Sequence, residues 1–578
     1  MHIPSQKVIL PLFAVLTLVT LTYGNHFHNG FHFDDFHTVT TNPYIRDLRN
    51  IPLIFSDADT FSTLPANRGW RPLVTTSLAI DYAMARGLKP RYFQTSDFLW
   101  FLVQLCLMYA LFRHILDFAR PGPVPAASSI GNRWIALFAT ALYGVHPAIA
   151  ETVNYIIQRG DLYSTLGVVA GLLIYIRWPA RRGQGLYLIP VLLGLLSKPP
   201  ALVFPAILFT YLMLFEDMRP VRALAKCTPA LLLSIGLGAL SSAMTPKSYD
   251  PGAWPAYDYR ITQPLVALRY FRNFFLPLEL SADTDHVAES SVFHGYAWLG
   301  VLFAIALLAI AIYCGRRREA PNADLRPIAF GIYWYILALL PTSIFPLAEI
   351  ENDHRMYFPF VGLTLSLVYA AALLCRPFLG LIRARIVIAV MCGLILCVAA
   401  RGTWRRNIVW RDEESLWFDV TLKSPKNGRG LMNYGLTQME KGAYVRALDY
   451  FTRALQYSPD YYVLEINLGI ANGALNNDAE AERHFARSLD LAPQDAQALY
   501  FYSQWLRERG RYSEAIQDLN ADIQYNPAYL DARYLLMWIY HDLGDTASLQ
   551  QTARQLLAEF PTDSVAQSWL AGQTPPAQ

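Results

Sequence analysis

The chain has 578 residues, of which 54% are hydrophobic and 13% aromatic, and its formal net charge at pH 7 is +3. This length exceeds that of one ordinary soluble domain, and the hydrophobic excess lies before residue 401. A net charge this small, with basic residues dispersed between apolar runs, argues against a nucleic-acid-binding surface, so no nucleic-acid partner is expected.

The first apolar run covers residues 8–23, behind Lys7. It lacks a small-x-small cleavage site, which favours an uncleaved membrane anchor over a signal peptide. Ten further apolar runs lie at about 94–116, 132–146, 161–178, 186–197, 200–215, 226–244, 296–314, 327–346, 357–375 and 384–400. Because a spanning helix needs roughly 20 apolar residues, the pattern predicts about eleven spans, several of them short.

The loops between these runs alternate in charge. With a cytoplasmic N-terminus, basic residues gather in every second loop, as at residues 181–182 and 316–318, which is the positive-inside pattern. An odd number of spans then places the C-terminal domain on the exported side. Because the exported loops are short and the repeats described next are few, we expect a bacterial inner membrane with the site and the repeats facing the periplasm. An endoplasmic-reticulum membrane, facing the lumen, is the alternative.

Prolines recur every 34 residues near the C-terminus. The five are Pro425, Pro459, Pro493, Pro527 and Pro561. This period, with a proline closing each second helix, is typical of tetratricopeptide repeats, which stack into an α-solenoid. We therefore predict an all-α chain, with a polytopic membrane helical bundle over residues 1–403 and a tetratricopeptide-repeat domain over residues 404–578. The repeat units are expected to end near Pro459, Pro493, Pro527 and Pro561.

Six tyrosines of the repeats allow two interpretations. They are Tyr457, Tyr461, Tyr462, Tyr500, Tyr525 and Tyr529. Their amphipathic rings suit either a concave surface that docks a partner protein or packing between repeats.

Two adjacent carboxylates, Asp34 and Asp35, stand in the first exported loop, which also carries Arg71. A carboxylate at a bilayer rim can be desolvated and so become a better proton acceptor, while its neighbour orients a donor group. The alternative is an ordinary solvated loop, since perturbed carboxylates are the minority.

Later exported loops bring further ionisable residues to the ends of spans. Arg159 and Asp161 precede one span, and Lys198 and Arg355 lie beside others. Such positions are unfavourable for charge unless the charge is used. The cations suit a lipid-linked phosphate at the bilayer surface, whose negative charge grows as it leaves in a transition state. Simple snorkelling of the basic side chains toward lipid headgroups is the alternative.

The sequence resembles the C-type (GT-C fold) glycosyltransferases, specifically the transmembrane and tetratricopeptide-repeat O-mannosyltransferases and their bacterial relatives. The similar segments are Phe33-Asp34-Asp35 with Asn42, Arg71-Pro72-Leu73, His146-Pro147 through Glu151 with Arg159-Gly160-Asp161, residues 352–357, and the repeats. The resemblance implies transfer of a sugar from a polyprenyl-phosphate donor to a hydroxyl of an exported protein, with inversion at the sugar carbon. The chain departs from the family at Lys198-Pro199-Pro200, where relatives often have an acidic residue after the lysine.

The resemblance also implies roles for individual residues. Asp34 or Asp35 is the expected general base. The expected contacts of the donor phosphate are Arg71, Arg159, Lys198 and Arg355. The residues expected to shape the site are His146, Glu151, Asp161, His354 and Tyr357. The repeats are expected to dock the exported acceptor protein, with membrane lipid around the bundle.

No metal and no other cofactor is expected, because phosphate is a good leaving group and fixed cations can bear its charge. Four histidines flank the two aspartates, at positions 26, 28, 32 and 37. Clusters of histidine and aspartate can hold a divalent metal, although this spacing matches no compact ligand motif. A metal-dependent site stays the alternative.

Three other functions stay open. A membrane-anchored scaffold for envelope protein complexes would use the repeats alone, for which eleven spans are excessive. A transporter of lipid-linked sugars would carry ionisable residues in the middle of several spans, whereas here they gather at the exported ends. A transferase of the same mechanism would pass its sugar to a glycolipid or an envelope polysaccharide.

Overall fold

The computed structural model describes residues 6–118, 126–250, 252–316 and 324–575. These residues contain helices and no β-strand, so the prediction of an all-α chain is confirmed. The chain divides into two compact units, Met1–Asp419 and Val420–Gln578. The division follows residue 419, whereas the sequence pattern placed the domain boundary after residue 403.

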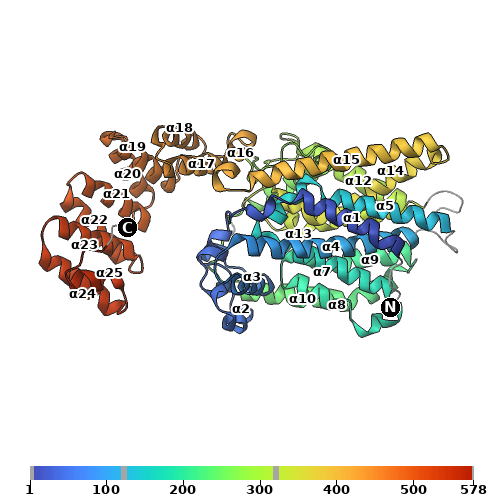
Figure 1. Ribbon diagram of the computed structural model, residues 1–578, viewed down its shortest axis with the longest axis horizontal. Coiled ribbons are helices and arrows are strands. Elements are labelled where there is room, and N and C mark those ends of the chain that lie inside the picture. Colours follow the sequence, from blue (N-terminus) through green and yellow to red (C-terminus); the bar gives the residue numbers. More distant parts are fainter. Residues whose placement is uncertain (1–5, 119–125, 251, 317–323, 576–578) are drawn as a thin grey trace. The chain divides into compact units, whose positions relative to one another are not determined.

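Unit 1 is a bundle in which long helices run side by side (Figure 1). Its helices are α1 Gln6–Thr22, α2 Ile51–Ser56, α3 Pro72–Ala85, α4 Pro90–Phe118, α5 Ala126–Gly144, α6 Ala150–Asn154, α7 Arg159–Arg177, α8 Leu188–Leu195, α9 Phe204–Phe215, α10 Pro220–Met244, α11 Ala256–Phe275, α12 Ala297–Gly315, α13 Arg326–Ile344, α14 Tyr357–Cys375 and α15 Ile382–Val409. α16, Glu413–Lys423, crosses the division between the units. Short 3-10 turns join many of these helices.

Seven stretches of the described chain are helical, long and apolar enough to cross a membrane, which fits a multi-pass membrane protein. The predicted count of eleven spans is not confirmed. The run 186–197 forms only the eight-residue α8. Eight helical residues rise about 12 Å, far less than the roughly 30 Å of a bilayer core. The next run, 200–215, forms a 3-10 turn and the 12-residue α9.

The first and last long helices of unit 1 end at the same end of the bundle. The Asn407 side-chain amide donates a hydrogen bond to the Thr22 carbonyl at 3.2 Å, and the Asn25 amide donates to the Trp404 carbonyl at 2.9 Å. The first loop and the residues after α15 therefore lie on one side of the bundle. This is the arrangement that an odd number of crossings produces.

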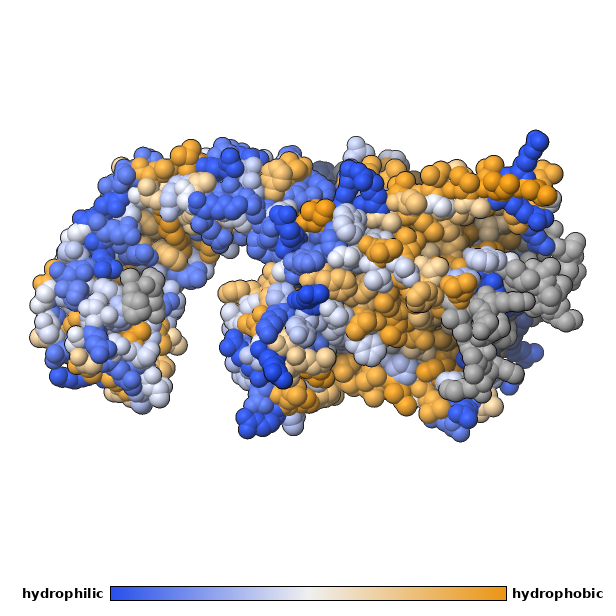
Figure 2. Space-filling view, in the orientation of Figure 1, coloured by the Kyte–Doolittle hydropathy of each residue, from blue (hydrophilic) through white to orange (hydrophobic). Residues whose placement is uncertain are grey.

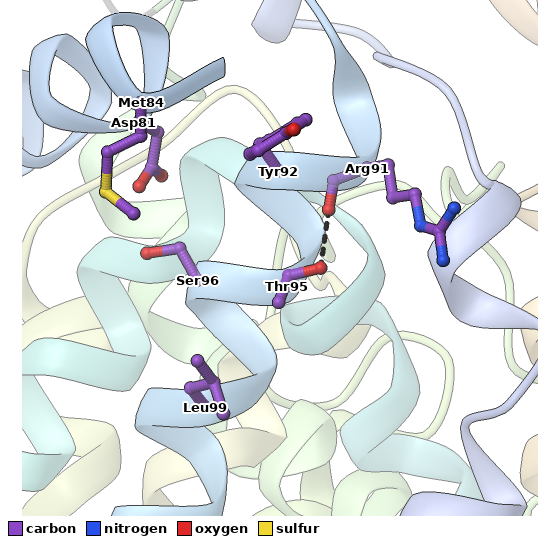
Figure 3. Close-up of a pocket in the computed structure, with 7 residues that line it drawn as sticks. All are labelled: Asp81, Met84, Arg91, Tyr92, Thr95, Ser96 and Leu99. Atoms are coloured by element: carbon purple, nitrogen blue, oxygen red, sulfur yellow. Dashed lines mark hydrogen bonds between the residues drawn. The ribbon is translucent and has the colours of Figure 1, made fainter.

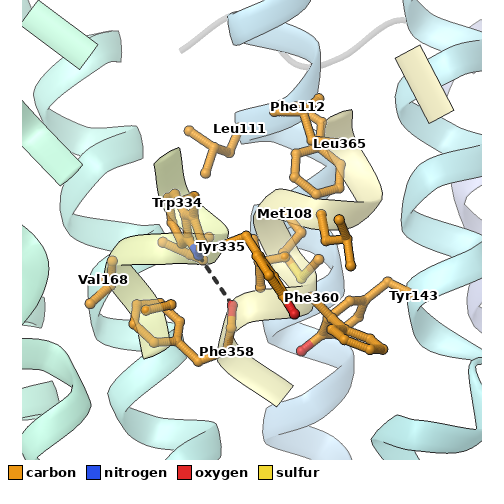
Figure 4. Packing of buried hydrophobic residues seen from close by; sticks show 14 of the residues in the cluster. Met108, Leu111, Phe112, Tyr143, Val168, Trp334, Tyr335, Phe358, Phe360 and Leu365 are labelled. Atoms are coloured by element: carbon orange, nitrogen blue, oxygen red, sulfur yellow. Dashed lines mark hydrogen bonds between the residues drawn. The ribbon is translucent and has the colours of Figure 1, made fainter. Parts of the chain in front are cut away.

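Aromatic and aliphatic side chains fill the centre of unit 1. Figure 4 shows Met108, Phe112, Tyr143, Trp334 and Phe358 packed in this core. The indole N–H of Trp334 donates to the Phe358 carbonyl at 3.1 Å. Because this buried donor is satisfied, the core holds a large aromatic ring without an unpaired polar group.

Helices α13 and α14 approach each other through two glycines. A Cβ atom added to Gly331 would lie 2.3 Å from the Gly362 carbonyl oxygen, and one added to Gly362 would lie 2.4 Å from Cβ of Trp334. Small residues allow such close approach of membrane helices. Any larger side chain at either position would push the two helices apart.

Unit 2 consists of paired helices, as the 34-residue period predicts. The helices are α17 Gly428–Glu440, α18 Tyr444–Leu455, α19 Tyr462–Ala474, α20 Asp478–Leu491, α21 Ala496–Glu508, α22 Tyr512–Tyr525, α23 Leu530–Asp542, α24 Thr546–Glu559 and α25 Ser564–Leu570. Gly435 packs on the Phe451 ring and Gly469 on the Phe485 ring, one repeat later. The predicted repeat architecture is confirmed.

The six repeat tyrosines divide between the two interpretations. Tyr462, Tyr500 and Tyr529 are partly buried against the core of unit 2. Tyr457, Tyr461 and Tyr525 are exposed. Burial alone therefore does not assign all six rings to one role.

The visible flank of the unit 1 bundle is largely apolar, as the orange surface in Figure 2 shows. The exposed side chains of α12 and α15 include Leu302, Ile305, Ile386, Val390 and Leu394. A contiguous apolar surface of this extent is rare on a protein surrounded by water. Its place on the long helices agrees with contact to lipid.

We expect Gly331→Val to lower the thermal stability of the chain, because its methyl groups overlap the backbone of α14. Overpacking of this kind destabilises by about 1–3 kcal/mol. The matched control is Gly393→Val on α15, where an added Cβ meets no atom within 4 Å. The measurement is the midpoint of thermal unfolding of the purified full chain in detergent. Equal midpoints for the two variants would contradict the close packing of α13 on α14.

Candidate active site

The loop that carries the two aspartates is held in an irregular conformation. Phe33 has a φ of +47°, and Asp35 begins a five-residue π-helical turn, Phe36–Thr40. The buried Asn42 amide donates to the carbonyls of Thr38 and Thr60, at 3.1 and 3.0 Å. These local bonds satisfy two carbonyl groups of the loop backbone.

The Asp35 carboxylate is completely buried. Its oxygens accept hydrogen bonds from the backbone N–H groups of Ile157, at 2.9 Å, and His32, at 3.1 Å. Burial raises the pKa of Asp35 to about 7, and the charge of Asp34 adds to the rise, while the two N–H donors oppose it. Asp35 joins the first loop to the turn that precedes α7.

The Asp34 side chain is 49% exposed, unlike its neighbour. One carboxylate oxygen lies 3.3 Å from Nε2 of His37. Burial alone would raise the pKa of Asp34, but the hydrogen bond and charge of His37, with Asn67 and Arg71, lower it below its ordinary value. The Asp34 backbone N–H donates to the Tyr155 hydroxyl at 2.9 Å. Asp34 is therefore an ionised carboxylate that solvent or a substrate can reach.

His32 links the same loop to the segment after α15 through hydrogen bonds. Its Nδ1 lies 2.7 Å from the Glu413 carboxylate, and its Nε2 lies 2.7 Å from the Trp410 carbonyl. Both ring nitrogens face oxygen atoms, so His32 holds the loop at two points. The Phe33 ring packs on Trp417, with centroids 4.7 Å apart.

Lys198 lies in a buried group of charges at the same end of the bundle. Its ammonium donates to the carboxylate of Asp161 and the side-chain carbonyl of Gln158, both at 2.7 Å. Burial lowers the pKa of Lys198, Asp161 opposes this, and the positive charges of Arg71 and Arg355 lower it further. Arg71 and Arg355 thus each lie close enough to repel Lys198, and an added anion would relieve that repulsion.

The two arginines of this group differ in their partners. Arg355 donates to the Glu349 carbonyl at 2.9 Å and lies 3.4 Å from the Glu349 carboxylate. The Arg71 guanidinium lies over the Phe61 ring, 4.8 Å from its centroid, and forms no ion pair with any described residue. Because Arg71 interacts electrostatically with both Asp34 and Lys198, it links the carboxylate to the cations.

Glu151 and His354 form a buried pair beside the cations. The Glu151 carboxylate lies 3.1 Å from Nδ1 of His354, and its second oxygen has no hydrogen-bond partner among the described residues. Burial and the charge of Asp353 raise the pKa of Glu151 well above its ordinary value, while Arg406 opposes them. His354 uses Nδ1 in this contact and keeps Nε2 available to a ligand.

Arg159 does not lie in the position expected of a phosphate contact. Its guanidinium is fully buried, 2.7 Å from the Asp81 carboxylate and 3.0 Å from the Asp97 carboxylate. Two acids already balance its charge, and no part of the side chain is exposed to a donor. We therefore assign Arg159 to the packing of α7 against α3 and α4.

Two residues expected to shape the site lie in apolar packing. His146 stacks on Phe274 and donates through Nε2 to the Phe274 carbonyl, 3.0 Å away, and burial lowers its pKa to about 4. The Tyr357 hydroxyl donates to the buried Gln104 side chain at 3.0 Å. Both residues support the helices behind the charged group and do not line it.

Several partners of the site residues were not predicted from the sequence. They are His37, Asn67, Tyr155, Gln158 and Glu349. His37 stood in the predicted histidine cluster, but nothing in the sequence singled out its contact with Asp34. The other four gave no local signal, because they reach the site through the fold.

The histidines do not converge on one point. His26 lies 3.0 Å from the Asn154 side chain and 3.2 Å from the Gln94 carbonyl, while His32 and His37 have the partners given above. Within the described ranges, no three His, Cys, Asp or Glu side chains are placed to hold a metal ion together.

A pocket of about 330 Å³ lies between α3 and the start of α4 (Figure 3). Its lining residues are Asp81, Met84, Arg91, Tyr92, Thr95, Ser96 and Leu99. In Figure 3 the Arg91 side chain points away from Asp81. None of the predicted site residues lines this pocket, so it is distinct from the group around Asp34 and Lys198.

Known proteins share both parts of this architecture. A model of the tetratricopeptide repeat matches residues 438–504. The chain is 23% identical over 563 residues to protein O-mannosyl-transferase Tmtc3 of Drosophila melanogaster, covering 85% of this chain and 59% of that protein. It is 22% identical to Tmtc1 of the same organism, covering 77% and 61%, and 22% identical to human TMTC1, covering 88% and 62%. The predicted resemblance is confirmed at modest identity over most of the chain, which spans about three fifths of these relatives' length.

A solved structure titled "Functional Characterization of Pseudomonas Aeruginosa pilF" aligns with 32% of this chain and 81% of its own chain. Its identity is 20% and its TM-score 0.24, too low to support any conclusion.

We expect Arg159→Gln to destabilise unit 1 strongly, because the buried carboxylates of Asp81 and Asp97 lose their cation. Removing one partner from a buried ionic group typically costs about 3–5 kcal/mol. The control is Arg91→Gln, which removes an exposed arginine of α4. The measurements are the amount of chain in the membrane and the midpoint of its thermal unfolding. If both variants behaved like the wild type, Arg159 would not have the packing role assigned to it.

Proposed function

We propose that the chain transfers a sugar from a polyprenyl-phosphate donor to a hydroxyl group of an exported protein. The relatives named as protein O-mannosyl-transferases support the reaction class. The observation that carries the proposal is the exposed carboxylate of Asp34 within electrostatic reach of Arg71, which is itself within reach of Lys198. An exposed carboxylate and a group of cations suited to a phosphate thus lie on one side of the bundle.

Asp34 acts as the general base in this proposal. A general base must come within hydrogen-bond reach of the proton that it removes, and only Asp34 of the two aspartates is exposed. Asp35 holds the loop through the N–H groups of Ile157 and His32 and is a positioning residue. Asp34 takes the proton while the acceptor oxygen attacks the anomeric carbon.

The departing phosphate takes the electron pair of the broken sugar–oxygen bond. Arg71, Lys198 and Arg355 stabilise the charge that develops on it. A single displacement of this kind inverts the anomeric carbon. The Nε2 atom of His354 and the carboxyl group of Glu151 lie beside the cations and orient the donor. This scheme needs no metal, and the lipid-linked sugar is a substrate.

The side of the membrane is part of the proposal. The loop with Asp34 and the segment after α15 share one end of unit 1, so the chain enters unit 2 on the side of the site. The positive-inside rule makes that side the exported one. We propose a bacterial inner membrane facing the periplasm, with the repeats docking the acceptor protein. Transfer to a glycolipid or an envelope polysaccharide is the second candidate, because the donor side of the site would be the same.

The test compares exported proteins from cells that carry the wild-type chain, Asp34→Asn, Asp35→Asn or no copy. We expect hexose-sized masses on particular Ser, Thr or Tyr residues to disappear with the deletion and with Asp34→Asn, provided all variants insert equally. Loss of a general base typically lowers a rate by about 10²–10⁴-fold. An unchanged glycoproteome with altered lipid-linked or surface glycans would support the second candidate. If neither pool changed while a protein complex dissociated, the chain would act as a scaffold.

The pH dependence of transfer distinguishes the two aspartates. The pKa of Asp34 lies below its ordinary value, so a base at this position stays ionised and the rate is flat between about pH 5 and 8. The pKa of Asp35 is about 7, so a base there would lose tenfold in rate for each unit below pH 7. The measurement is the single-turnover rate of the purified chain against pH. A transfer rate that declines from pH 7 downward would identify Asp35, and not Asp34, as the general base.

We expect Arg71→Gln to lower kcat/KM for the lipid donor by roughly 10²-fold, the usual effect of removing one stabilising donor. Arg71 has no ion-pair partner among the described residues, so its removal leaves no buried acid unbalanced. Thermal stability should therefore stay near the wild-type value. Transfer at the wild-type rate by Arg71→Gln would exclude Arg71 as a phosphate contact.

A further inference from the structure

Three carboxylates and three tyrosine rings meet on neighbouring repeats of unit 2. We call them the acid–tyrosine cluster: Asp495, Asp522, Asp531, Tyr462, Tyr500 and Tyr529. We propose that this cluster binds a lysine or arginine side chain of a polypeptide segment. The proposal gives a chemical identity to the docking role of the repeats, and it rests on the proposed function only in taking that polypeptide to be the acceptor.

The cluster is continuous because the first helices of successive repeats pack together. Tyr462 begins α19, Tyr500 lies in α21, and Tyr529 directly precedes α23. α19 contacts α21, and α21 contacts α23. The Tyr500 and Tyr529 rings lie edge to face, with centroids 5.8 Å apart, and the Tyr462 hydroxyl bonds to Asp495.

The carboxylates of the cluster have no cation of their own. Within the described part of the chain, none of the three forms an ion pair. Elsewhere in unit 2, acids pair with arginines, as in Asp460 with Arg487, Asp478 with Arg509, and Asp542 with Arg507. Residues 420–578 contain 18 acidic and 13 basic side chains. The cluster therefore keeps a negative charge that the fold does not neutralise.

Asp522 shows that a partner is missing within the unit itself. Its side chain is fully buried, and one oxygen accepts from the Asn526 amide at 2.8 Å. The second oxygen has no hydrogen-bond partner among the described residues. Asp522 lies within electrostatic reach of Asp495 and of the Tyr529 hydroxyl, so it belongs to the same cluster. A buried carboxylate oxygen without a donor is unfavourable, and a nearby positive charge would offset this cost.

The tyrosines favour an ammonium or guanidinium group over a metal ion. An ammonium or guanidinium group is attracted to the face of an aromatic ring, and the apolar stem of lysine or arginine packs along it. A metal ion would gain nothing from three tyrosine rings that are only partly buried. Because the rings lie on successive repeats, they also offer contacts to residues that flank the cation in an extended chain.

The experiment measures binding of short fluorescein-labelled peptides to the full chain in detergent by fluorescence anisotropy, without any sugar donor. The peptides are extended Ser/Ala sequences whose central residue is Lys, Arg, Gln or Glu. We expect the Lys and Arg peptides to bind, the Gln peptide to bind at least about tenfold more weakly, and added salt to reduce the difference. Equal affinity for the Gln and Lys peptides would overturn the proposal.

Two variants and a control locate the site. Asp531→Asn changes a partly exposed cluster residue and is expected to weaken Lys-peptide binding about tenfold; Asp522→Asn should do the same. Asp490→Asn removes one charge from an exposed position of α20 and should leave binding unchanged. If Asp531→Asn and Asp490→Asn bound equally well, the cluster would not be the site. Because no transfer occurs in this assay, Asp34→Asn should bind the peptide like the wild type, so failure of the transferase proposal is seen separately.

Discussion

The burial of one guanidinium between two carboxylates holds together the end of the bundle on which the site is built. Arg159 begins α7, while Asp81 belongs to α3 and Asp97 to α4. Removing the guanidinium leaves two buried carboxylates without their cation, so the three helices are tied to one relative position. The residues on either side of Arg159 bind the loop with the two aspartates and the Lys198 side chain. Within the segment 157–161, the backbone N–H of Ile157 donates to Asp35 in the loop that carries the two aspartates. The side chains of Gln158 and Asp161 accept hydrogen bonds from Lys198.

Residues of the same type differ in their surroundings at this end of the bundle. Asp35 is buried and occupied by backbone donors, while Asp34 next to it is exposed and ionised. In the same way Arg159 pairs with two buried acids, whereas Arg71 forms no ion pair with any described residue. A site that binds a phosphate needs cations that the protein has not already neutralised. The distribution of partners, more than the identity of the residues, thus separates the structural from the functional charges.

The helical architecture and the repeats followed from periodicity, because apolar run length and a 34-residue spacing are local properties of the chain. The number of spans did not, since a run such as 186–197 is apolar without being long enough to cross. Asp34, Asp35 and Lys198 were identified by their place beside spans. The assignment of Arg159 to the donor could not be tested from the sequence, because its partners lie on helices whose packing only the fold fixes. Likewise, no local sequence pattern predicted that Glu349 would pair with Arg355.

The most direct test of the account is transfer by the purified full chain with a synthetic polyprenyl-phosphate hexose and a Ser/Thr-containing acceptor peptide. The account predicts a hexose-sized mass gain on a hydroxyl residue, release of polyprenyl phosphate in equal amount, and an anomeric configuration opposite to that of the donor. A product of retained configuration would contradict the single displacement. Transfer from a nucleotide sugar, with none from the lipid donor, would contradict the proposed role of the cations around Lys198.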